Sequence, residues 1–392
     1  MKRIAVIGAG AAGCFCTAEL RRLRPDFRVD VYESGPKALA KVAVTGGGRC
    51  NLTNSFEGIR SLAEAYPRGE RLMKRLMKQF SQEDTWRWFE DAGVPLVLQD
   101  DHCVFPRSQD AMDIVHALLR RMEGVNLLLR TPVHAIGPDL TVDGEAYDAV
   151  VVTTGGAPKG LPLLEGLDLE WVPTAPSLFT FTIQDEGLRA LMGLVVEATV
   201  SIPGTTFKAD GPLLITDWGL SGPAVLKLSS YAARHLHDAG YKAPLSVNWL
   251  SLSEAETRAL LEELSTANPR KQVSNTPPAG LQARLWNYLT VKAGLRLDIR
   301  WAELGSKGLN KLVNTLAQDS YTIAGKTKFR DEFVTCGGVA LSNLNPATLE
   351  SKQYPGLYFA GEVLDIDAIT GGFNLQAAWT TGYVAAQSIA SK

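Results

Sequence analysis

A glycine motif near the start of the chain constrains the fold more than any other feature. Gly8, Gly10 and Gly13 form the pattern G-x-G-x-x-G, directly after the apolar segment 4–7 and before a helical pattern. The segment "RVDVYES" then reads as the next strand. This order of strand, glycine turn, helix and strand predicts a βαβ unit over residues 3–33, and so an α/β fold with a parallel sheet.

The spacing of the glycines also predicts a ligand. Gly8 permits a tight turn, Gly10 lets the backbone approach a pyrophosphate, and Gly13 lets the helix pack closely on the strand. Glu33 ends the second strand 20 residues after Gly13, where its carboxylate can accept hydrogen bonds from ribose hydroxyls. We therefore expect a dinucleotide here, with backbone N–H groups of the helix start holding the phosphates. The alternative is a tight turn with incidental glycines. The further residues assigned to this contact are Ala11, Ala12 and Ser34.

The C-terminal sequence indicates which dinucleotide binds. The stretch "GLYFAGEVLDIDAITGGFNLQAAW" predicts a strand at 357–360, the pair Gly361-Glu362, a loop, and a helix from about Asn374. Two-part flavoproteins close over FAD in this way, and a simple nicotinamide dehydrogenase does not need such a return. The helix start would place the amides of Phe373, Asn374 and Leu375 near the flavin, where negative charge develops on reduction. The earlier strand "VVVTTGG", with Thr154 and Gly155, fits the same plan.

The chain of 392 residues is long enough for two or three domains. Its character changes near residue 185 and returns near residue 337. We expect a discontinuous Rossmann-type FAD-binding domain over 1–185 plus 337–392, a β-rich, barrel-like insert over 186–252 plus 319–336, and a small helical domain over 253–318. Within the first domain, 66–92 and 110–122 read as helices, while 125–136 and 147–152 read as strands.

Several blocks resemble one family of flavoproteins. "KVAVTGGGRCNLTN", "HCVFPRSQDAMDIVHAL", "GLSGPAVLKLSS" and "GGFNLQAAW" are similar to the BaiN/RdsA family, also labelled aminoacetone-oxidase-family FAD-binding enzymes. The resemblance runs over nearly the whole chain. It implies a Rossmann-type FAD domain with an inserted barrel-like domain and a small helical one, and it implies non-covalently bound FAD.

The resemblance also assigns residues to the cofactor. It implies a second FAD segment in the triple-glycine stretch and a closing segment at Gly361, Glu362, Asn374 and Leu375. Val133 falls on a segment read as a strand whose backbone meets the adenine. The residues of the second segment are Lys41, Thr45, Gly46, Gly47, Gly48, Arg49, Cys50 and Asn51.

The family implies more than one chemistry. One branch resembles bile-acid enone reductases, another is implied to reduce a uridine of ribosomal RNA to dihydrouridine, and an amine-oxidase label also exists. In the first two, hydride from reduced flavin attacks a polarised C=C bond and an acid protonates the neighbouring carbon. The block "GLSGPAVLKLSSY" resembles the RNA-modifying relatives more than the bile-acid ones, and this resemblance makes ribosomal RNA the leading substrate. The alternatives are a small-molecule flavin enzyme and a non-catalytic FAD-binding protein.

The electron donor and the acid are less directly indicated. No second G-x-G-x-x-G follows residue 185, so we expect NAD(P)H to act as a transient reductant on the substrate side. Cys50 is one candidate proton donor, with a packing role as the alternative. Asp217 is a second catalytic candidate, because the resemblance implies that its block, with Trp218, faces the flavin and contacts the substrate. This chain reads Thr216-Asp217-Trp218 where many relatives read Thr-His. A histidine role in relatives therefore does not transfer.

The remaining cysteines and histidines are expected to have no role in a metal site. Cys14, Cys16 and Cys336 are read as packing residues. His235 and His237 lack neighbours that would complete a metal site, so no metal is expected. His102 precedes the "VFP" block, near which we expect the domain interface, and stays open as a catalytic candidate.

Charge and targeting signals bound the partners. The net charge is −2, so only a local basic face would meet RNA. Two such faces are candidates, and each has solvation as its alternative reading. Five cysteines without metal-like pairing, no apolar run of about 18 residues and no signal peptide lead us to expect a reducing cytoplasm and no membrane. The sequence leaves the oligomeric state open. The basic faces are Arg71, Lys74, Arg75 and Lys78, and Lys326, Lys328 and Arg330.

Overall fold

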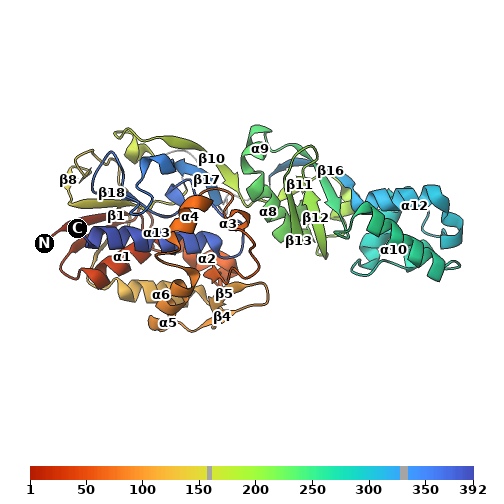
Figure 1. Ribbon diagram of the computed structural model, residues 1–392, viewed down its shortest axis with the longest axis horizontal. Helices are drawn as coiled ribbons and strands as arrows, with labels where there is room; N and C mark the ends of the chain where they lie inside the picture. The colour runs from red at the N-terminus through yellow and green to blue at the C-terminus, as the bar shows by residue number, and fades with distance from the viewer. Residues whose placement is uncertain (157–160, 327–333) are drawn as a thin grey trace. The chain divides into compact units, whose positions relative to one another are not determined.

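The computed structural model describes residues 1–156, 161–326 and 334–392. The chain forms two compact units, Met1–Ala175 with Val334–Lys392, and Pro176–Phe333 (Figure 1). The division falls earlier than the predicted boundary at 185, because strand β11 (Phe181–Ile183) pairs with strands of the second unit. The predicted α/β class, with a β-rich insert in a Rossmann-type domain, is confirmed.

The first unit is built on a five-stranded parallel sheet in the order β18-β9-β1-β2-β6. Ile7 lies opposite Tyr32 on one side and Val152 on the other, so β1, β2 and β9 end at the same edge. Segments that follow these strands are therefore brought together. The strands are β1 (Arg3–Ile7), β2 (Arg28–Tyr32), β6 (Asn126–Leu128), β9 (Ala149–Val152) and β18 (Leu357–Phe359).

Helices α1 (Ala11–Leu23) and α13 (Phe373–Ala390) lie side by side (Figure 1). A Cβ on Gly382 would lie 2.7 Å from the carbonyl oxygen of Ala12, so the two backbones approach closely. Cys14 and Cys16 are both fully buried although they are two residues apart, which indicates that α1 is covered on more than one face. Their predicted packing role agrees with this burial.

Smaller elements complete the first unit. They are α2 (Ala40–Gly48), β3 (Thr53–Asn54), α3 (Leu62–Ala65), α4 (Glu70–Leu76), α5 (Gln82–Asp91), β4 (Leu96–Leu98), β5 (Cys103–Pro106), α6 (Ala111–Arg121), β7 (Thr141–Val142), β8 (Glu145–Ala146), β10 (Trp171–Ser177) and β17 (Val334–Val339), with 3-10 turns η1 (Pro162–Leu164), η3 (Leu341–Asn343) and η4 (Gly361–Val363).

Two expectations for this unit need correction. The predicted helix over 66–92 is two helices, because Ser81 and Asp84 form a reciprocal capping box that starts α5 anew. The predicted strand over 125–136 ends at Leu128, so Val133 is not on a strand. Arg130 turns the chain with a φ of +55°, and Pro132 has no N–H with which to continue pairing.

The second unit contains a closed antiparallel barrel in the order β11-β14-β13-β12-β15-β16. Its remaining strands are β12 (Val195–Ser201), β13 (Lys208–Ile215), β14 (Gly219–Ser221), β15 (Ala243–Asn248) and β16 (Asp319–Lys326). Its helices are α7 (Glu186–Arg189), α8 (Pro223–Tyr231), α9 (Ala233–Asp238), α10 (Glu254–Ala267), α11 (Ala283–Lys292) and α12 (Trp301–Ala317), with the 3-10 turn η2 (Val273–Asn275).

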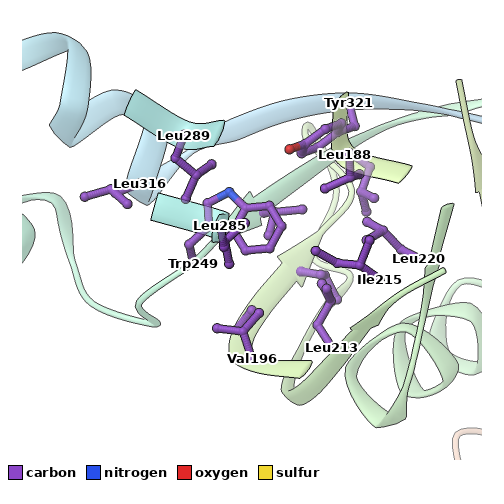
Figure 2. Close-up of a cluster of buried hydrophobic side chains, with 14 of the residues drawn as sticks. Leu188, Val196, Leu213, Ile215, Leu220, Trp249, Leu285, Leu289, Leu316 and Tyr321 are labelled. Carbon is purple, nitrogen blue, oxygen red and sulfur yellow. The ribbon is translucent and has the colours of Figure 1, made fainter. Parts of the chain in front are cut away.

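The barrel and the helices of the second unit share one hydrophobic core (Figure 2). Trp249 lies between Leu285 and Leu289 of α11, Leu316 of α12, and barrel residues such as Val196. The indole N–H of Trp249 donates to Asp319 Oδ2 at 3.0 Å. The segment 253–318, which was expected to form a separate helical domain, thus packs into the same compact unit as the barrel. In the described ranges, no helix is long and apolar enough to cross a membrane.

Candidate cofactor site

The three glycines of the first motif have different surroundings. A Cβ on Gly8 would lie 2.6 Å from the Thr153 carbonyl oxygen, and one on Gly13 would lie 2.0 Å from the Gly8 carbonyl oxygen. Gly8 also has a φ of +107°. Beside Gly10, no atom lies within 4 Å of the Cβ position. Packing therefore requires glycine at positions 8 and 13, whereas Gly10 faces open space, as the motif predicts for close approach of a ligand.

Helix α1 begins without a side-chain cap. Its N-cap is Gly10, and the first intrahelical hydrogen bond runs from the Cys14 N–H to the Gly10 carbonyl at 2.9 Å. The N–H groups of Ala11, Ala12 and Gly13 therefore have no acceptor within the helix. They form a donor set suited to an anion at the positive end of the helix dipole.

Glu33 is held rigidly beside this loop. Its Oε2 accepts from the Ala9 N–H at 3.0 Å, and its Oε1 accepts from the Gly35 N–H at 2.6 Å. Oε1 also accepts from the Ser34 hydroxyl at 3.4 Å. A carboxylate has about four lone-pair sites, so Oε2 keeps capacity for a further donor. Ser34 is exposed next to it, and Val133 lies in the irregular segment after β6, half-buried.

The triple-glycine stretch turns the end of α2 into a left-handed run. Thr45 leaves the helical region with a ψ of 149°. Gly46, Gly47 and Gly48 follow with φ values of +58°, +70° and +84°. No atom lies within 4 Å of the Cβ positions of Gly47 and Gly48. These residues thus leave bare backbone facing open space, while Lys41 is exposed on the helical part of α2.

The polar residues after the glycines differ in their roles. Arg49 donates through Nε to the Gly46 carbonyl at 3.2 Å and lies 4.6 Å from the ring centre of Phe105. Cys50 is fully buried with a φ of +59°, and burial raises the pKa of its thiol to about 12. Asn51 has a buried Oδ1 that accepts no hydrogen bond from the described part of the chain.

A third segment follows strand β9. Thr154 carries a buried Oγ1 for which residues 1–156, 161–326 and 334–392 provide no hydrogen-bond partner. Gly155 has a φ of +79°, and its Cβ position lies 3.8 Å from Glu362 Oε2. Glu362 Oε1 accepts from the Thr335 N–H at 2.8 Å. Gly361 has only 2.8 Å between its Cβ position and the Ala12 Cβ, so the closing segment passes directly against the start of α1.

The N-terminus of α13 completes the arrangement. Gly372 is its N-cap, with a φ of +88° and no side-chain cap. The first intrahelical bond runs from the Gln376 N–H to the Gly372 carbonyl at 3.0 Å, which leaves the N–H groups of Phe373, Asn374 and Leu375 without intrahelical acceptors. The Asn374 side chain both accepts from the Ala368 N–H and donates to the Ala368 carbonyl. Its amide group therefore fixes the preceding loop.

Strand β3 ties the triple-glycine stretch to α13. Thr53 Oγ1 donates to Gln376 Oε1 at 2.5 Å, and the Trp379 indole N–H donates to the Leu52 carbonyl at 2.9 Å. A Cβ on Gly372 would lie 2.7 Å from Asn51 Oδ1. Four segments far apart in the sequence thus converge within the first unit. We call them the glycine cradle: residues 8–13, 45–51, 154–155 and 361–375.

Two contacts that support the cradle were not predicted. The Tyr66 hydroxyl, fully buried, donates to the Phe373 carbonyl at 2.9 Å. Arg68 forms a bidentate ion pair with the buried carboxylate of Asp367. Burial alone would lower the pKa of Arg68, but hydrogen bonds and charge from Asp367 outweigh it and raise that pKa. Sequence patterns carry no signal for these pairs, which are separated by about 300 residues.

Other candidate residues are not part of the four cradle segments. Asp217 belongs to the second unit, where it is exposed between β13 and β14 and its carbonyl accepts from Arg189 Nε at 2.6 Å. His102, with a φ of +65°, has its Nδ1 3.4 Å from Ser55 Oγ. His235 and His237 lie on α9. Among the residues that the structure describes, no group of three metal-ligating side chains occurs. Lys328 and Arg330 lie outside the described residues.

The cradle fits FAD on the observations above. Open space beside Gly10, Gly47 and Gly48 leaves room for a ligand against bare backbone. Two helix starts offer N–H donors, and the buried Asn51 Oδ1 and Thr154 Oγ1 have unused hydrogen-bonding capacity. Buried polar atoms without partners are rare, and a polar ligand in the cradle would give both atoms a partner.

Comparison with known proteins identifies the family of the chain. The family model described as HI0933-like protein Rossmann domain matches residues 2–388. The chain is 30% identical to the ribosomal RNA dihydrouridine synthase of Escherichia coli (strain K12), covering 98% of this chain and 97% of that protein. It is 28% identical to the 3-dehydro-bile acid delta(4,6)-reductase of Clostridium scindens, covering 100% of both.

A solved structure agrees at the level of fold. The 3-ketosteroid delta1-dehydrogenase of Sterolibacterium denitrificans, in complex with 1,4-androstadiene-3,17-dione, superposes with a TM-score of 0.50 at 15% identity and covers 100% of both chains. At that identity the likeness concerns the fold alone.

Proposed function

The chain belongs to the HI0933-like Rossmann-domain family and is an FAD-dependent oxidoreductase, and we propose that it reduces a polarised C=C bond, with a uridine of ribosomal RNA as substrate. The family match confirms the resemblance found in the sequence. The observation that carries the proposal is the convergence of the glycine cradle within one unit, together with full-length similarity to a relative named for dihydrouridine synthesis.

In this proposal different residues of the cradle bind different parts of FAD. The N–H groups at the start of α1 would hold the phosphates, and Glu33, fixed by Ala9 and Gly35, would accept from a ribose hydroxyl. The N–H groups at the start of α13 would hold the flavin, and Asn374 fixes the preceding loop through Ala368. When bound, the flavin supplies hydride for reduction of the double bond.

The sequence offers Cys50 and Asp217 as candidates for the catalytic role. Asp217 is exposed, which suits contact with a large substrate. Cys50 is fully buried within the core of the first unit, which favours its packing role. We therefore propose substrate contact for Asp217 and packing for Cys50.

We also propose NAD(P)H as a transient reductant rather than a resident cofactor. In the described parts of the chain, the second unit is built on an antiparallel barrel instead of a second parallel sheet with a glycine motif. A nicotinamide would then have no Rossmann unit of its own.

Mass spectrometry of ribosomal RNA from a strain lacking this protein tests the substrate. We expect the loss of one dihydrouridine, restored by the intact protein but not by an FAD-free variant. An unchanged modification profile would refute the ribosomal RNA assignment. A purified protein that binds no FAD even when FAD is supplied would refute the cofactor as well.

Small-molecule reduction is the second candidate. The bile-acid reductase matches over 100% of both chains, only slightly below the RNA-modifying relative in identity. Oxidation of NAD(P)H by the FAD-loaded protein, with a 3-oxo-Δ4,6 steroid or with ribosomal RNA from the deletion strain, separates the two readings. Turnover with the steroid alone would favour the second. No turnover with any acceptor would favour a non-catalytic FAD-binding role.

A further inference from the structure

Helix α4 presents a basic face to solvent. Its buried side is made by Leu72, Met73 and Leu76. Arg71, Lys74 and Arg75 on the helix, and Lys78 in the turn after it, are all exposed. The helical period thus gathers four positive side chains on one surface within about two turns. We call these four residues the α4 basic face.

The members of this face have no acidic partners in the described part of the chain. None of them takes part in an ion pair, although nearby Arg68 and Arg87 do. Glu70, in the first turn of α4, is the nearest acid along the helix, and it pairs with none of the four. Unpaired cations gathered on one face, in a chain with net charge −2, form a local positive potential that the overall charge hides.

Helix α4 and the residues just before it pack against the loop before α13, which is part of the glycine cradle. Gly69, the residue before α4, would place a Cβ 2.6 Å from Ile366 Cγ1. Arg68 is locked to Asp367, and Asn374 holds the same loop at Ala368. Helix α4 also contacts α13 (Figure 1). The face therefore starts within a few residues of the loop that leads to the N-terminus of α13.

We propose that the α4 basic face is a docking surface for the phosphates of the RNA substrate; this inference rests on the ribosomal RNA function proposed above. Lysine and arginine side chains that neutralise phosphates release condensed counterions, which gives affinity without base specificity. Such contacts fix the register of a strand while other groups read the reactive base.

An RNA strand suits this face better than a membrane does. Membrane-surface helices combine a basic face with exposed apolar anchors. The large apolar side chains that are exposed in the described residues include Met1, Val44, Leu98 and Met112, and none of them lies on α4. The apolar residues of α4 are instead directed into the protein core.

The test compares two neutralised variants of the FAD-loaded full chain. One carries Arg71→Gln, Lys74→Gln, Arg75→Gln and Lys78→Gln. The matched control carries Arg270→Gln, Lys271→Gln, Lys307→Gln and Lys311→Gln, four exposed basic residues of the second unit that likewise form no ion pair with described residues. FAD content, measured by absorbance, should be unchanged in both.

Binding of labelled, deproteinised ribosomal RNA from the deletion strain is then measured against salt concentration. In the α4 variant we expect affinity at low salt to fall roughly tenfold or more, and the slope of log affinity against log salt to shrink by about 3. The control should keep the wild-type slope. Equal losses in both variants, or no loss in the α4 variant, would overturn the docking surface.

Dihydrouridine formation in the same RNA separates this inference from the proposed function. Wild-type turnover with undiminished binding by the α4 variant overturns the docking surface and leaves the function standing. Absence of dihydrouridine with the wild-type protein overturns the function and the docking surface with it. Displacement of the RNA by polyglutamate at equal charge would also overturn the assignment, in favour of an acidic protein partner.

Discussion

Arg68 and Asp367 form a buried bidentate ion pair that joins the start of α4 to the loop before α13. Asp367 is fully buried, and Arg68 is only 14% exposed. A bidentate pair fixes orientation as well as distance. The pair therefore holds the closing loop of the glycine cradle in one position relative to α4.

Removing one partner should be costly because it leaves the other charge buried. We expect Asp367→Ala to lower the free energy of unfolding by about 3–5 kcal/mol and to weaken FAD retention. Urea unfolding of the first unit, followed by tryptophan fluorescence, measures the first effect, and flavin release on dilution measures the second.

The double variant Arg68→Met with Asp367→Leu serves as the control. Replacing a buried pair by apolar residues of similar volume is often neutral for stability. We expect it to recover most of the lost stability. A double variant as unstable as the single one would contradict this explanation of the pair.

A second prediction concerns the bare backbone of the triple-glycine stretch. Gly47→Ala introduces a methyl group into space that the protein leaves open and at a φ of +70°. Gly204→Ala is the matched control in the second unit, with a φ of +79° and equally open surroundings. Both should lose about 1–2 kcal/mol from backbone strain.

Only the first of these variants should lose FAD. We expect the flavin content of Gly47→Ala to fall severalfold, measured by the absorbance ratio of flavin to protein, while Gly204→Ala retains wild-type content. Equal flavin content in both variants would remove Gly47 from the cradle.

Local motifs allowed much of the first unit to be predicted. Gly8, Gly10 and Gly13 lie in one short loop. Their spacing in the sequence was enough to predict which of them face packed backbone and which faces open space. The capping box at Ser81 and Asp84 was also readable, since its S-x-x-D pattern stands in the sequence, but the continuous apolar period hid the break between α4 and α5. Val133 was misplaced because its strand assignment ignored the effect of Pro132.

Long-range contacts could not be predicted in the same way. Tyr66 and Phe373, or Arg68 and Asp367, meet only because α13 returns to the first domain after the insert. Each of these side chains has an ordinary local context. The sequence also did not show that the barrel and the helices after it form one unit. The apolar faces of α11 and α12 cover the barrel residues around Trp249 and do not form a core of their own.

A third prediction concerns thiol reactivity. None of the five cysteines is in a disulfide, and all five are buried. Burial raises the pKa of Cys50 to about 12 and that of Cys103 to about 11. Because the thiolate is the reactive form, the native protein should react with almost no equivalents of Ellman's reagent at pH 8. In denaturant all five should react. Rapid reaction of one native thiol, mapped to Cys50 by mass spectrometry, would reopen its role as a proton donor.

The fourth prediction concerns acid stability and rests on Asp30. Its carboxylate is only 2% exposed. Burial would raise its pKa, but hydrogen bonds from Asn126, Tyr147 and Arg28 outweigh burial and hold the pKa below its ordinary value of 3.8. A carboxylate with a lowered folded pKa stabilises the protein above its unfolded pKa, and this contribution is lost as pH falls through the folded pKa.

Asp30→Asn should therefore lower the free energy of unfolding at pH 7 by about 2 kcal/mol, the scale of hydrogen bonds to a charged group. As pH falls below 3.8 the difference from the wild type should shrink, because the unfolded chain binds a proton at Asp30 more readily than the folded chain does, until the folded carboxylate is protonated as well. Urea unfolding across this window measures the effect, with the exposed Asp100→Asn as the control that should follow the wild type throughout. A constant difference between Asp30→Asn and the wild type at every pH would mean that misplaced hydrogen-bond donors, and not the lost charge, cause the destabilisation.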